Sequence, residues 1–94
     1  ANLHRANLSQ SIIAASKMIG VNLSGANLSY STITMSDFKH AIFLNSKLNH
    51  SQIIKTSFKK ADFTGTNFND AISESADVGE AIFSLEKEPM LEGC

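Results

Sequence analysis

The sequence has one cysteine, no extended hydrophobic run and no opening segment with the features of a signal peptide. Cys94, the last residue, has no second cysteine with which to form an internal disulfide or a CxxC pair for zinc or redox chemistry. No stretch is long and apolar enough to span a bilayer, and no charged-then-apolar leader opens the chain. We therefore expect a cytoplasmic protein in a reducing compartment, without a membrane partner.

The length of 94 residues is enough for one small domain. The chain begins at Ala1, without an initiator Met and already within the repeat described next. We expect it to be a processed product or a part of a longer polypeptide.

What the sequence does contain is a five-residue repeat that runs over residues 1–85 in 17 consecutive blocks. The first position of each block is Ala, Ser, Thr or Val. The third position is apolar in every block except the one with Ser73, which we interpret as decay of the repeat toward its end. The third positions are Leu3, Leu8, Ile13, Met18, Leu23, Leu28, Ile33, Phe38, Phe43, Leu48, Ile53, Phe58, Phe63, Phe68, Ser73, Val78 and Phe83.

A period of five fits neither a continuous helix nor a continuous strand. Five residues advance an α-helix by about 500°, and an odd period in a strand alternates the face on which the large residue lies. The chain must therefore bend within every block, which closes it into a coil with the small and apolar positions inside. Third-position residues are most alike between blocks that lie 20 residues apart, a spacing that we call a stride of 20. This spacing predicts that four blocks make one coil.

Blocks such as Ala1-Asn2-Leu3, Ala26-Asn27-Leu28 and Ala61-Asp62-Phe63 resemble the pentapeptide-repeat family. The resemblance implies an all-β fold, a right-handed quadrilateral β-helix (solenoid) of about four coils of four pentapeptides. The family usually has Asp or Asn at the second position, and this chain has them in eight blocks. It departs from that pattern with Ile at four second positions: Ile12, Ile42, Ile72 and Ile82.

The last segment, residues 86–94, breaks the repeat and contains Pro89, Met90 and Leu91 among polar residues. Both ends of a solenoid expose apolar side chains and unpaired backbone groups that need a cover. We therefore divide the chain into a β-helix over residues 1–85 and a short C-terminal cap or linker over residues 86–94.

Charge is sorted along the chain although it nearly cancels overall. Residues 1–60 carry seven basic residues and only Asp37 as an acid, whereas residues 61–94 carry eight acidic residues and only Lys87 as a base. The rod is therefore expected to be bipolar.

Within the basic part, a stride of 20 stacks Lys39 beneath Lys59 and His40 beneath Lys60, with Lys55 at the adjoining corner. Like charges on neighbouring strands are mildly destabilising, so this cluster is a candidate contact surface for an acidic partner. The alternative is a solvated ladder in which each basic side chain is neutralised within the rod. The stacked pairs that the alternative requires are Lys17 with Asp37, Lys60 with Glu80, and His50 with Asp70.

Large apolar residues at positions that should face outward form a second candidate surface. Ile42 and Leu44 share one wall, whereas Ile12, Ile54 and Ile72 lie on another. These two areas could contact flanking segments or another subunit, so end-to-end or face-to-face self-association remains an open alternative. The outward-facing apolar residues are Ile12, Ile19, Met35, Ile42, Leu44, Ile54, Ile72 and Ile82.

The polar residues do not form a catalytic, cofactor or metal site. His4, His40 and His50 fall on three walls and cannot share a metal ion. The serines mostly occupy the first position, where a small inward side chain is all that the fold requires. We therefore expect no enzyme activity and no cofactor.

Three functions remain to be weighed. The first is a non-catalytic protein-binding or scaffold module, free-standing or the recognition part of a larger protein, such as a bacterial secreted effector delivered into a host cell. The second, which the resemblance suggests, is a DNA mimic that protects or inhibits a type II topoisomerase (gyrase). Residues 1–85 carry seven basic and six acidic residues, too balanced for DNA mimicry, so we favour the first. Direct nucleic-acid binding is not expected, because the aromatic residues belong to the core.

Overall fold

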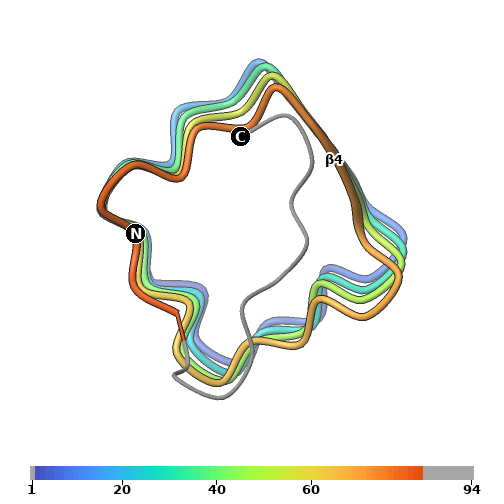
Figure 1. Ribbon diagram of the computed structural model, residues 1–94. Helices are drawn as coiled ribbons and strands as arrows, with labels where there is room; N and C mark the ends of the chain where they lie inside the picture. The colour runs from blue at the N-terminus through green and yellow to red at the C-terminus, as the bar shows by residue number, and fades with distance from the viewer. Residues whose placement is uncertain (1, 84–94) are drawn as a thin grey trace.

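The computed structural model describes residues 2–83, which wind as a coil around one axis. The strands β1 (Ile12–Ala14), β2 (Thr32–Thr34), β3 (Gln52–Ile54) and β4 (Ile72–Glu74) form one parallel sheet in that order. Figure 1 looks along the axis, and successive coils nearly superpose on a four-sided outline. The molecule measures 26 × 24 × 22 Å, so the rod is about as long as it is wide.

The register between coils is the same on every wall, because each residue pairs with the residue four blocks later. In the sheet, Ile13 pairs with Ile33, Ile33 with Ile53, and Ile53 with Ser73. On the other walls, parallel bridges join residues such as Asn2 with Asn22, Asn7 with Asn27, and Lys17 with Asp37. Four blocks therefore make one coil, which confirms the predicted right-handed quadrilateral β-helix. We number the coils by residues: coil 1 is 1–20, coil 2 is 21–40, coil 3 is 41–60 and coil 4 is 61–80.

The core is a set of stacked columns made by the third position of each block, as predicted. In coils 2 and 3 every third-position side chain is buried, as are those of Phe63 and Ser73, and the other third positions toward the ends of the rod are partly buried. Phenylalanine rings stack along two columns, with centroids 5.3 Å apart for Phe38 and Phe58 and 4.9 Å apart for Phe43 and Phe63. Edge-to-face contacts join the columns, as between Phe58 and Phe63. Such pairs add about 0.5–1.5 kcal/mol each to the free energy gained from burial.

The first position of each block also points inward, and its serines are structural. The hydroxyls of Ser31 and Ser51, both buried, donate to the carbonyls of Leu28 and Leu48 at 2.6 Å. A buried hydroxyl costs free energy unless it is hydrogen-bonded, and here the backbone supplies the acceptor. Ser31 and Ser51 are thus satisfied parts of the core.

Each corner depends on the fifth position of its block, where the backbone has a positive φ in all sixteen blocks from Arg5 to Glu80. At most corners the next residue donates to the third-position carbonyl, as from Ala26 to Leu23 at 3.0 Å. This bond together with the left-handed residue identifies a type II turn. Glycine occupies only three of these sites, among them Gly25 and Gly65, but β-branched residues occupy none.

The Asn and Asp residues at the second position close a small turn in front of each corner. The Oδ1 atoms of Asn22, Asp37 and Asp62, for example, accept the backbone N–H two residues later at 3.0 Å. All eight Asn and Asp residues at this position make the same bond. The isoleucines that replace them cannot, since their side chains have no acceptor.

The wall that contains the strands turns its corner in a different way. Here the backbone N–H of Ser16 donates to the hydroxyl of Ser36 at 3.1 Å, and that of Ser36 to the hydroxyl of Thr56 at 3.4 Å. Each hydroxyl in turn donates to the carbonyl two residues earlier, at the end of its strand. A column of hydroxyls thus replaces the type II turn after β1–β3, where the preceding residues remain extended; after β4 the same position is Ala76, which has no hydroxyl.

Ser73, the one polar third position, is 5% exposed, and its hydroxyl has no hydrogen-bond partner among the described residues. The predicted cap or linker, residues 86–94, lies outside the described residues.

We predict that Gln10→Val lowers the free energy of unfolding by about 1 kcal/mol, because a β-branched side chain is disfavoured at positive φ. The φ of Gln10 is 61°. Gln52→Val is the matched control: Gln52 is exposed in β3, where a β-branched residue suits the strand, so no loss is expected. Urea unfolding followed by circular dichroism measures both, and equal stabilities would contradict the role assigned to the corner.

We also predict opposite effects of removing two buried hydroxyls. Ser73→Ala should raise the free energy of unfolding by about 1 kcal/mol, because it removes an unpaired buried hydroxyl. Ser51→Ala should lower it by about 1 kcal/mol, because it removes the hydrogen bond to the Leu48 carbonyl. The same unfolding experiment compares them, and a loss of stability in Ser73→Ala would show that its hydroxyl is used.

Candidate protein-binding surface

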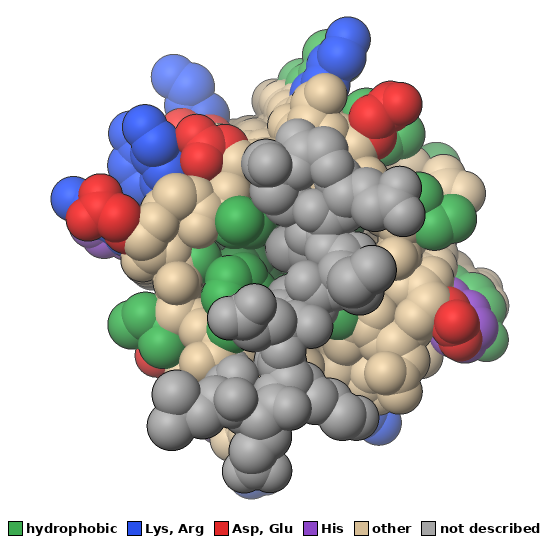
Figure 2. Space-filling view, in the orientation of Figure 1, with side chains coloured by type: hydrophobic (Ala, Val, Ile, Leu, Met, Phe, Trp, Pro, Cys, Tyr) green, Lys and Arg blue, Asp and Glu red, His purple; other side chains and the backbone are tan. Residues whose placement is uncertain are grey.

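The stacked basic residues of coils 2 and 3 lie where the sequence predicted. The bridge between Asp37 and Ser57 fixes the register, so Lys39 lies beneath Lys59 and His40 beneath Lys60. The backbone N–H of His40 donates to the carbonyl of Lys59 at 2.9 Å, which ties the two coils together at this corner. Figure 2 shows basic side chains gathered there, with acidic side chains beside them.

Lys55 lies at the opposite corner of the same wall. It follows β3 directly and has a φ of 50°, and its backbone N–H donates to the carbonyl of Glu74. The structure therefore brings together four of the five predicted residues and leaves Lys55 apart from them. We call Lys39, His40, Lys55, Lys59 and Lys60 the basic patch.

The stem of Lys59 lies across Gly79 of the next coil. A Cβ atom at residue 79 would come within 3.6 Å of the Lys59 Cγ atom and 3.8 Å of its Cε atom. The Oδ1 atom of Asp77 accepts the N–H of Gly79 at 2.9 Å, so this carboxylate is held against the backbone. The exposed Lys59 side chain thus extends over the backbone of Gly79.

Acidic residues within the rod do not fully neutralise the basic patch. Lys17 and Asp37 are bridge partners in the backbone register, and Lys60 lies beneath Glu80. Over residues 2–83, however, the ion-pair contact that forms is the one between His50 and Asp70. The four lysines of the patch therefore have no carboxylate partner in contact within the described part of the chain.

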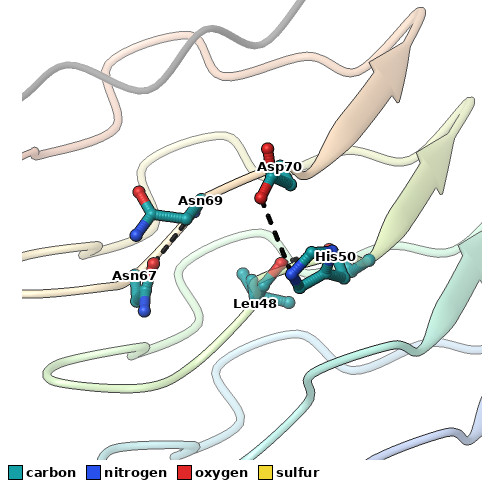
Figure 3. Close-up of polar contacts among 6 residues, drawn as sticks. Leu48, His50, Asn67, Asn69 and Asp70 are labelled. Carbon is teal, nitrogen blue, oxygen red and sulfur yellow. Dashed lines mark hydrogen bonds and ion pairs between the residues drawn. The ribbon is translucent and has the colours of Figure 1, made fainter.

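The His50–Asp70 contact belongs to a ladder at another corner. The Nε2 atom of His50 lies 3.6 Å from the Oδ2 atom of Asp70, and Figure 3 shows the two side chains facing each other. Below them the ring of Tyr30 stacks on that of His50, with centroids 4.7 Å apart and planes 5° from parallel. Sequence reasoning found the His50–Asp70 pair but missed the Tyr30 stack, although the four-block spacing between Tyr30 and His50 indicates it.

The remaining histidines and acidic residues do not converge. His4 lies on another wall, where its Nδ1 atom is 2.7 Å from the hydroxyl of Ser24. No group of three or more His, Cys, Asp or Glu residues is placed to hold a metal ion in residues 2–83. The part of the chain that the structure describes also contains no helix that could cross a membrane.

The outward-facing apolar residues are exposed, as predicted, except for Ile54, which is half-buried. Ile42 and Leu44 share one wall and are 39% and 37% exposed, whereas Ile12 and Ile72 on the sheet are 79% and 63% exposed. Tyr30, at the corner just before β2, is 57% exposed and lies beside the sheet wall. The sheet wall is therefore the more exposed of the two predicted apolar areas.

Comparisons with solved structures give the same fold. A pentapeptide repeat protein of the Arabidopsis thaliana thylakoid lumen matches with a TM-score of 0.81 at 16% identity, over 93% of this chain and 59% of its own. A pentapeptide repeat protein of Nostoc PCC 7120 matches with a TM-score of 0.55 at 22% identity, over 90% of this chain and 72% of its own. The chain thus spans a little over half the length of the thylakoid protein. Comparison with curated proteins gives no match.

A protein-family model also matches the five-residue repeat of this chain. The model of pentapeptide repeats, found in 8 copies, matches residues 1–43, 36–70 and 46–84, which together cover most of the sequence. Its matched ranges together span the coils whose register, corners and core are described above. The chain belongs to the pentapeptide-repeat family.

Proposed function

We propose that this chain is a non-catalytic protein-binding module whose basic patch contacts an acidic protein surface. The observation that carries the proposal is the stacking of Lys39 with Lys59 and of His40 with Lys60, with no carboxylate in contact with these lysines in residues 2–83. Like charges stacked on neighbouring strands cost stability, and an acidic partner would relieve that cost. The lone Cys94 supports a reducing, cytoplasmic setting for such a module.

The shape of the rod favours binding over catalysis. Its outward side chains diverge from four walls, whereas catalysis needs an acid, a base or a nucleophile to converge on one reacting atom. Parallel coils also fix each backbone position in a column, so the backbone beneath the patch is held in one arrangement. A backbone of this kind loses little conformational freedom on binding.

The charges of the described residues weigh against DNA mimicry. Duplex DNA carries about one negative charge per 1.7 Å, which a mimic must reproduce along its length. Residues 2–83 carry seven basic and six acidic residues, and the acidic ones are concentrated in coil 4. Coils 1–3 thus have the wrong sign for a protein that would replace DNA on a topoisomerase.

We predict that Lys59→Glu/Lys60→Glu weakens binding of a fluorescent poly-glutamate probe at least about 10-fold. Fluorescence anisotropy at low and at high salt measures the affinity. Arg5→Glu/Lys47→Glu is the matched control, because it changes the net charge equally at sites outside the patch. A loss of only about 2-fold is expected for it. Equal losses in both variants would show a general charge effect and contradict a localised patch.

A second experiment separates the three functions considered above. We expect the protein to give no protection in a gyrase assay and no shift of duplex or single-stranded nucleic acid at high salt. Protection of gyrase would instead support DNA mimicry, and a salt-resistant shift would support nucleic-acid recognition. Either result would replace the proposed protein-binding function.

A further inference from the structure

The wall formed by β1–β4 differs from the other walls in its backbone and its side chains. It alone, within residues 2–83, contains continuous strands, and the Ser16, Ser36 and Thr56 hydroxyls hold the corner after β1–β3. Its outward side chains are uncharged except at one position. They are Ile12, Ala14, Thr32, Thr34, Gln52, Ile54, Ile72 and Glu74, which we call the β1–β4 face.

The most exposed large apolar side chains gather on this face and its edges. Ile12 is 79% exposed and Ile72 is 63% exposed on the face itself. Tyr30 and Met35, at the corners on either side of β2, are 57% and 63% exposed. A surface with one charged side chain and several exposed large apolar side chains is typical of a protein-interaction site.

We propose that the β1–β4 face binds a second copy of this chain, in a symmetric dimer whose two rods run antiparallel. In this dimer β1 of each copy lies opposite β4 of the other, and β2 lies opposite β3. A two-fold axis parallel to the strands generates the arrangement, since it reverses the order of the coils but keeps the position along each strand. The interface is then isologous, so every contact occurs twice.

The pairs that this symmetry creates are complementary. Ile12 meets Ile72 of the second copy, Thr34 meets Ile54, and the hydroxyl of Thr32 meets the amide of Gln52. The unshifted parallel register from β1 to β4 fixes these pairs. The two-fold axis therefore produces an apolar contact at each end of the interface and a polar contact at its centre.

The charges favour this orientation over a parallel one. Glu74, the one charged residue of the face, meets Ala14 of the second copy, and Lys55 at the edge meets Met35, so no like charges are opposed. Over longer range, residues 2–60 have a net charge of +6 and residues 61–83 a net charge of −5. Antiparallel rods place the acidic coil 4 of each copy beside the basic coil 1 of the other, whereas parallel rods would place the acidic coils side by side.

The size of the face predicts a weak dimer. With dimensions of 26 × 24 × 22 Å, one wall offers on the order of 500 Å² to a partner, and two copies would bury about 1,000 Å² in total. That area is at the lower limit for specific interfaces, so we expect a dissociation constant of about 10 µM or weaker. The dimer should therefore exchange with monomer over accessible concentrations.

Sedimentation analysis of the 94-residue chain, from about 10 µM to about 1 mM, tests the proposal. We expect a reversible monomer–dimer equilibrium that Ile12→Lys/Ile72→Lys weakens at least about 10-fold, because the introduced ammonium groups face each other across the interface. Ile19→Lys/Ile42→Lys adds the same charge on other walls and should change the dissociation constant less than about 2-fold. Circular dichroism confirms that both variants keep the fold.

Two outcomes would overturn the proposal. One is a chain that stays monomeric at the highest concentration, and the other is an equal effect of the two double variants.

Disulfide cross-linking tests the orientation separately. In a Cys94→Ser background, a mixture of Thr32→Cys and Gln52→Cys chains should cross-link faster than either variant alone, because residue 32 of one copy meets residue 52 of the other. Faster self-linking of either single variant would overturn the antiparallel arrangement.

Discussion

The left-handed residue at the end of each block is the constraint on which the whole structure depends. It turns the chain by one corner in every block, so four corners close a coil and the next coil begins directly above the first. Thirteen of the sixteen corners place a side-chain-bearing residue in this conformation, which costs energy at each site. Hydrogen bonds between coils and the stacked core offset that cost, and both exist only if every block ends in a corner.

Because the corners repeat, outward side chains that are 20 residues apart stack in columns along the surface. Each column is a separate ladder of side chains. Four residues of the basic patch form two such columns, in which Lys39 lies beneath Lys59 and His40 beneath Lys60. The Tyr30–His50–Asp70 ladder is a third, formed by ring stacking and an ion-pair contact. The β1–β4 face is a broader surface, because two columns of outward side chains flank the buried Ile13 column. Different columns can therefore carry different contacts without disturbing one another.

The sequence alone predicted the period, the coil of four blocks and the inward positions, because burial makes a strict demand on residue size at those sites. It also placed the basic patch, since a register of four blocks determines which residues stack. The type of corner was not predicted, because the fifth positions share no single residue type and the only trace is the lack of β-branched residues there. Nor was the extended wall, which depends on hydroxyl-to-backbone bonds from Ser16, Ser36 and Thr56 rather than on strand propensity.

The same register makes the surface sensitive to the length of the chain in a way that the core is not. Insertion of a single block between coils 2 and 3 would keep small and apolar residues inside, so the rod would still be filled. Every later residue would move by one wall, however, which would separate Lys59 and Lys60 from Lys39 and His40 and divide the β1–β4 sheet after β2. Surface patterns that span coils can therefore survive only insertions and deletions of four blocks, whereas the interior accepts any whole number of blocks.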